Sequence, residues 1–174
     1  MLWRRFFVLS LVAIALGGCG FRSLYGEHSH GDVREMLASV FVDPIEDRAG
    51  QIMRNELIDL LNPLGTPRNP RYRLSVRLAI SEISYGVEAS ALSTRANLEI
   101  GARFGLIERR KTDEKGGVAW IEEFNASRKV VAGYNVFSSD FSTYEAKRDA
   151  EVRAIRELAK EIQAQISIYL AQSR

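Results

Sequence analysis

The sequence has very little cysteine and histidine, and this narrows the chemistry it can perform. Of 174 residues, one is cysteine and two are histidine. A lone cysteine cannot form an internal disulfide or a Cys-x-x-Cys motif. The sequence also lacks a glycine-rich phosphate loop and the nucleophile elbow of serine hydrolases. We therefore expect no enzymatic activity, no catalytic residue and no cofactor.

The two histidines, His28 and His30, lie in a short polar stretch with Glu27 and Asp32. Imidazole and carboxylate groups at this spacing could bind zinc or copper. A flexible His-x-His stretch is more often a polar linker, because no scaffold preorganises the ligands. We favour the linker and predict no metal site.

An excess of charge is also lacking outside the N-terminus. The chain carries 24 basic and 22 acidic side chains, and Arg4 and Arg5 account for the whole difference. A domain without net charge is not expected to bind nucleic acid, although a local basic patch stays possible.

Long apolar runs are absent except at residues 6–16, which follow two arginines. This run is shorter than the roughly 20 residues that span a bilayer. A basic start, a short apolar run and small residues after it are typical of a secretion signal. We predict a signal peptide over residues 1–18.

The residues at the predicted cleavage site, Leu16-Gly17-Gly18-Cys19, resemble the lipobox of bacterial lipoproteins. This resemblance implies that Cys19 becomes the acylated first residue of the mature chain, with palmitate-like chains holding it firmly in a membrane. The alternatives are an ordinary signal peptide with a chance cysteine, or a short membrane anchor. Gly20 stands where an aspartate would imply retention at the inner membrane, so we expect the outer membrane.

Removing 18 of the 174 residues leaves 156, which suits one domain. Residues 19–32 are predicted to form a lipidated tether and residues 33–174 a single α+β domain. Residues 40–42 form a short apolar strand, and Asp47 is expected to cap the helix that follows it. Alternation with period two predicts three longer strands. A long helix closes the chain, and Ser142 or Thr143 is expected to cap it.

The expected fold is a two-layer α+β sandwich in the order βαβββα. Two helices cover one face of a four-stranded mixed sheet, with the first two strands parallel because a helix connects them. The core is expected to bury a set of apolar residues from strands and helices: Leu57, Leu98, Ile100, Trp120, Phe124, Ile155 and Ile162. Val118 has the same parity as Trp120 and is expected on the same side.

The other face of the predicted sheet is polar and basic. Gly101 and Gly105 share this face and would leave bare backbone that a partner could approach closely. The pattern fits a solvated surface with glycine bulges, and equally a surface that docks on a hydrophilic wall or binds an anionic ligand. The basic residues of this face are Arg73, Arg77, Arg95, Arg103 and Lys129.

The start of the predicted mature chain, Cys19-Gly20-Phe21-Arg22-Ser23-Leu24-Tyr25-Gly26, resembles the lipopolysaccharide-assembly lipoprotein family LptE in its alphaproteobacterial form. Ser23 departs from the proline common there. The order of strands and helices extends the resemblance over the mature chain. It implies an outer-membrane lipoprotein that plugs and helps assemble the LptD barrel, with which it forms the translocon that inserts lipopolysaccharide into the outer leaflet.

The resemblance implies three partners: the LptD-type barrel, lipopolysaccharide and the outer membrane. Parity, and not transfer from the family, makes Arg77, Arg95 and Lys129 candidates for contact with lipopolysaccharide or the barrel, together with Arg73 and Arg103. An alternative is a periplasmic lipid- or solute-handling auxiliary lipoprotein of an inner-membrane transporter, which would need an apolar pocket. An enzyme is the third and least favoured reading.

Overall fold

The computed structural model describes residues 30–83, 95–111 and 117–173. The predicted signal peptide 1–18, the lipidation site Cys19 and His28 lie outside these residues. Most of the predicted tether 19–32 and the side chain of His30 lie outside the description too.

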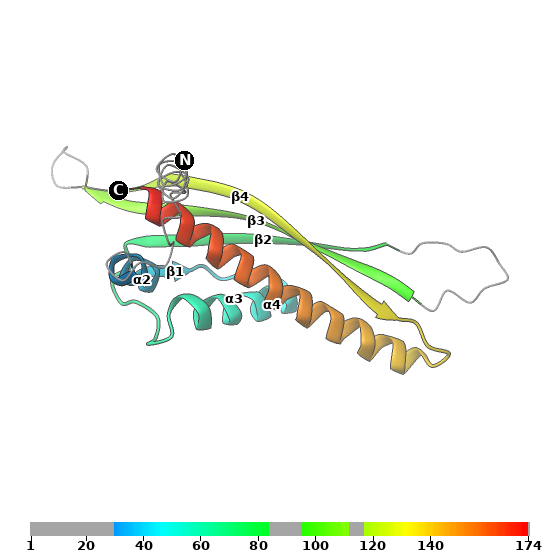
Figure 1. Ribbon diagram of the computed structural model, residues 1–174. Coiled ribbons are helices and arrows are strands. Elements are labelled where there is room, and N and C mark those ends of the chain that lie inside the picture. The colour runs from blue at the N-terminus through cyan, green and yellow to red at the C-terminus, as the bar shows by residue number, and fades with distance from the viewer. Residues whose placement is uncertain (1–29, 84–94, 112–116, 174) are drawn as a thin grey trace, which may run out of the picture. The chain divides into compact units, whose positions relative to one another are not determined.

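The described chain contains three helices and four strands. In chain order they are α2 (His30–Ala38), β1 (Val40–Val42), α3 (Asp47–Leu61), β2 (Tyr72–Ile83), β3 (Arg95–Lys111), β4 (Val118–Asn135) and α4 (Asp140–Gln172) (Figure 1). The predicted order βαβββα is confirmed from β1 onward.

The strands form one mixed sheet in the order β1-β2-β3-β4. β1 pairs parallel with β2, and the other neighbours are antiparallel, as predicted. The parallel pair follows from α3, which carries the chain back to the same end of the sheet. α3 contacts β1 and β2, while α4 contacts β3, β4 and α3. Both helices lie on one face of the sheet (Figure 1), so the two-layer α+β sandwich is confirmed.

Helix α2 was not predicted, because nine residues form too short a helix to be stable on their own. Its last turn is held from outside: the Asn62 side-chain amide donates to the Ala38 carbonyl oxygen at 3.0 Å. This contact joins residues 24 apart in the chain and leaves no local sequence signal.

Both predicted helix caps are wrong, by one residue for α3 and by three or four residues for α4. Glu46 is the N-cap of α3, and Asp47 is its first helical residue. The N-cap of α4 is Ser139, whose hydroxyl oxygen accepts from the Ser142 amide. Thr143 instead bonds the backbone of Phe137, which lies before the helix.

The core lies between the sheet and the two helices. Five predicted core residues are almost fully buried there: Leu57, Leu98, Ile100, Ile155 and Ile162. Phe124 is partly buried and stacks on Tyr169 of α4, with ring centroids 4.8 Å apart. Trp120 was predicted in this core and is 41% exposed, which makes that prediction wrong.

A β-bulge explains the position of Trp120. Leu106 pairs with Phe124, but Ile107 pairs with Glu122, so Glu123 is an extra residue in β4. One extra residue exchanges the two faces of a strand beyond it. Trp120 and Val118 therefore lie on the sheet face away from the helices, and the prediction for Val118 is wrong for the same reason.

Candidate functional site

The sheet face away from α3 and α4 is called here the open face. Strand alternation places odd-numbered residues of β2 and β3 on it, together with the odd-numbered residues of β4 that follow the bulge. The structure brings all five basic residues predicted from parity to this face: Arg73, Arg77, Arg95, Arg103 and Lys129.

The centre of the open face holds two arginines side by side. Arg77 of β2 pairs directly with Arg103 of β3, and Ser127 of β4 pairs with Arg103 on its other side. Side chains paired across antiparallel strands start about 5 Å apart. Both arginines are exposed, and neither forms an ion pair with any described acidic group. The pair therefore concentrates positive charge at the centre of the open face, where it can bind an anion.

The other three basic residues are separated from this pair and engaged elsewhere. Arg73 donates to Asp43 Oδ1 from Nε at 3.0 Å and from Nη2 at 2.8 Å. Lys129 forms an ion pair with Glu99 at 3.0 Å. Arg95 lies near the far end of β3, paired with Asn135. The described part of the face therefore has one central cationic pair, Arg77 and Arg103.

The two glycines of the open face differ. A Cβ on Gly101 would meet only carbonyl oxygens at 3.9 and 4.0 Å, so this stretch of backbone is open as predicted. A Cβ on Gly105 would lie 2.6 Å from Asn125 Oδ1. The Asn125 side chain, which donates to Glu122 at 2.8 Å, covers Gly105. The prediction of bare backbone is thus correct for Gly101 and wrong for Gly105.

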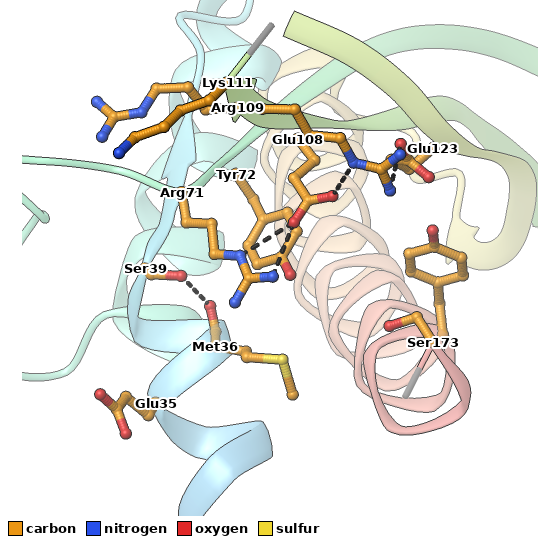
Figure 2. A pocket seen from close by; sticks show the side chains of 12 residues that line it. Glu35, Met36, Ser39, Arg71, Tyr72, Glu108, Arg109, Lys111, Glu123 and Ser173 are labelled. Carbon is orange, nitrogen blue, oxygen red and sulfur yellow. Dashed lines mark hydrogen bonds and ion pairs between the residues drawn. The ribbon is translucent and has the colours of Figure 1, made fainter. Parts of the chain in front are cut away.

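A cleft of about 1040 Å³ lies at one end of the sheet. Figure 2 shows Arg71 and Glu108 meeting in it between α2 and the last turn of α4. The walls come from α2, the start of β2, the end of β3, the bulge of β4 and the end of α4. Charged and polar side chains make up most of this lining, unlike the apolar pocket that a lipid- or solute-handling protein would need.

Glu108 is the centre of an ion-pair network in this cleft. One carboxylate oxygen accepts from Arg71 at 2.9 and 3.0 Å, and the other accepts from Arg110 at 2.8 Å. Arg110 also pairs with Glu123 at 3.0 Å. Burial raises the pKa of Glu108, but the hydrogen bonds from Arg110 and Arg71 outweigh burial and hold it below its ordinary value. Glu108 is therefore a fixed anion that orients two guanidinium groups.

The pKa values of two tyrosines in the cleft shift in the opposite direction. Burial raises the pKa of Tyr72 and of Tyr169, and nearby Glu108 adds to both shifts. All three shifts move these groups away from neutral pH, as expected for a structural ion-pair network. Sequence reasoning missed this cleft, although Glu108 continues the buried parity of β3 and could have been noticed as a carboxylate at a core position.

Two features are absent from the described ranges. No helix in them is long and apolar enough to cross a membrane. Among the side chains described there, no three His, Cys, Asp or Glu groups converge on a possible metal site.

Comparison with known proteins was made on sequence and on structure. The model of the family LptE, described as Lipopolysaccharide-assembly, matches residues 37–166. Curated protein sequences give no significant match.

Among solved structures, a candidate lipoprotein from Caulobacter crescentus CB15 aligns with a TM-score of 0.63 at 20% identity, over 82% of this chain and 98% of that one. A minor lipoprotein from Acinetobacter baumannii aligns with a TM-score of 0.49 at 15% identity, over 75% and 92%. The first of these shows a shared fold.

Proposed function

Because the chain belongs to the lipopolysaccharide-assembly family LptE, we propose that it acts as a plug inside the LptD-type barrel of the outer membrane. Family membership gives a role in lipopolysaccharide assembly and the character of an outer-membrane lipoprotein. The proposal adds that Cys19 carries the lipid anchor, and that the domain lies in the barrel lumen and helps the barrel assemble.

The open face carries this proposal. Lumens of large outer-membrane barrels are polar, and the open face offers a broad polar surface that no described helix covers. Lipopolysaccharide bears phosphate groups, which arginine binds through two parallel hydrogen bonds. Arg77 and Arg103 stand side by side without a described acidic partner, so they are the best candidates for such a contact. Arg73, Arg95 and Lys129 are proposed as weaker contacts.

The test is a double charge reversal, Arg77→Glu with Arg103→Glu. An exposed charge contact is worth only about 0–1 kcal/mol, so both residues are changed together. We expect weaker capture of the barrel, weaker binding of lipopolysaccharide, or both. The loss should be larger at low salt, where screening is least.

The matched control reverses two exposed arginines of the helix layer, Arg48→Glu with Arg148→Glu. It changes net charge by the same amount and leaves the open face intact. Circular dichroism checks that both variants fold. If the folded Arg77/Arg103 variant captures the barrel and binds lipopolysaccharide as the parent does, the open face is only a solvated surface, and the family assignment stands without it.

A further inference from the structure

The end of the β3–β4 hairpin carries a second, smaller surface on the open face. Its four residues, Arg109, Lys111, Val118 and Trp120, are called here the end patch. The register pairs Arg109 with Trp120 and Lys111 with Val118, so the patch is a square of two basic and two apolar side chains. It exists only because the bulge turns Trp120 and Val118 away from the core.

All four side chains of the end patch are available to a partner. Trp120 is 41% exposed and Val118 57% exposed. Arg73 lies over the Trp120 ring, with its guanidinium carbon 5.5 Å from the ring centroid, and so fixes the ring in place. Arg109 and Lys111 are exposed, and the Arg109 side chain donates to the neutral Asn69 at 2.6 Å.

Two described acidic groups near the patch are engaged on the helix side of the sheet. Glu108 lies on the helix side of β3, where Arg71 and Arg110 hold it, and Arg110 also binds Glu123. No described acidic group forms an ion pair with Arg109 or Lys111. Glu122 lies beside Trp120 on the open face, where the Asn125 amide donates to it.

The end patch lies at the same end of the sheet as α2, the helix that follows the segment from Cys19. Lys111 lines the same cleft as Met36 of α2 and Ser173, which follows α4. Figure 1 shows α2, the end of β3 and the start of β4 together at this end. α2 begins at His30, eleven residues after Cys19. Eleven residues span about 40 Å at most, so an anchor at Cys19 would keep this end within reach of the membrane surface.

We propose that the end patch rests on an anionic phospholipid surface. Tryptophan is favoured at the boundary between headgroups and acyl chains, and arginine and lysine bind anionic headgroups from the same depth. Trp120 and Val118 enter this boundary, while Arg109 and Lys111 contact the phosphate groups. The contact rests on the lipid anchor of the proposed function and involves only the end of the domain nearest that anchor. It leaves Arg77 and Arg103, at the centre of the open face, for the barrel lumen.

Trp120 provides its own reporter. The sequence contains two tryptophans, and Trp3 lies in the predicted signal peptide, so Trp120 is the only tryptophan of the predicted mature chain. Excitation at 295 nm selects it over the tyrosines. Mature acylated protein is placed in vesicles of phosphatidylglycerol and phosphatidylcholine whose acyl chains carry bromine near the headgroup. Flotation isolates the vesicle-bound protein. A side chain that enters this boundary lies within reach of the bromine, so we expect roughly a twofold loss of Trp120 emission and a shift to shorter wavelength.

A charge-reversal variant distinguishes the contribution of Arg109 and Lys111 to the membrane contact from that of the lipid anchor. Arg109→Glu with Lys111→Glu should restore most of the emission, as should vesicles of phosphatidylcholine alone. The control Arg148→Glu with Lys160→Glu reverses the same two residue types on α4 and should leave the quenching unchanged.

Trp120 emission that is as strong on brominated vesicles as on unbrominated ones overturns the proposal. So does quenching that is equal on neutral vesicles and unaffected by the Arg109/Lys111 reversal. Protection of Trp120 only when the barrel is present would assign the patch to a protein wall, which also overturns it. Because these vesicles contain neither barrel nor lipopolysaccharide, failure here leaves the proposed role in lipopolysaccharide assembly untouched, and a failure of barrel capture would not alter the quenching.

Discussion

Tyr134 permits a test of how the long C-terminal helix is held on the sheet. Its hydroxyl donates a short hydrogen bond to Glu82 Oε1, while Lys147 of α4 donates to Glu82 Oε2 at 2.6 Å. One carboxylate thus joins β2, β4 and the first half of α4. Tyr134 is 5% exposed, so its hydroxyl has little access to water if this bond is lost.

The size of the effect follows from the pKa. Burial and the hydrogen bond to Glu82 raise the pKa of Tyr134 from 10.0 to about 12. The folded pKa lies above the unfolded one, so the stabilisation is complete below pH 10 and disappears as pH rises toward 12. A difference of two pKa units corresponds to at most about 3 kcal/mol, with about half of it lost by pH 11.

The perturbation is Tyr134→Phe, followed by denaturant unfolding from pH 8 to pH 11. At pH 8 we expect the variant to be less stable by about 1.5–3 kcal/mol, the range for a hydrogen bond to a charged group. The gap should narrow with rising pH, because only the parent loses this contribution.

The matched control is Tyr144→Phe, whose hydroxyl belongs to a side chain that is 57% exposed on α4. It should change stability little at any pH. A gap between parent and Tyr134→Phe that stays constant from pH 8 to pH 11 would refute the reasoning from linkage. No gap at pH 8 would refute the contribution of the hydrogen bond itself.

Three further outcomes are expected. Mass spectrometry of the mature N-terminus should find acylated Cys19, and Cys19→Ala should leave the domain folded but released or unprocessed; an unmodified Cys19 or another first residue would contradict this. Ile162→Ala should lower the free energy of unfolding by about 2–5 kcal/mol, because the side chain is fully buried; a change under 1 kcal/mol in denaturant titration would contradict it. Glu108→Gln should cost about 1–3 kcal/mol at pH 7. Its folded pKa is lowered, so the parent's advantage should fade as pH falls below about 4, and an advantage that persists in acid would count against the network with Arg71 and Arg110.

Periodicity was enough to predict most of the architecture. Leu98 and Ile100 lie on the buried side of β3 because period-two alternation assigns a face without knowledge of the partner strands. The parallel pairing of β1 with β2 followed from the connecting helix. The residues that cap or hold the helix ends were harder to predict. Asn62 holds the end of α2 across 24 residues, and such a contact has no local sequence signature.

The candidate site also combines features that periodicity predicts with features that only the folded sheet sets. Parity alone assigned Arg77 and Arg103 to one face. Their direct pairing depends on the register between β2 and β3, which sequence spacing does not specify. The Arg71–Glu108–Arg110 network likewise joins the start of β2 to the end of β3, so it exists only in the folded sheet.

The sequence by itself determined which residues form strands, which helical stripes are apolar and which strand face is basic, because side-chain periodicity is a local property of the backbone. Only the tertiary structure decided where that periodicity is interrupted. Glu123 adds one residue to β4 opposite Leu106 and Ile107, and every side chain before it in β4 changes face. Trp120 thereby moves from the predicted core to the surface, since a bulge is set by the pairing of two strands and not by the sequence of one.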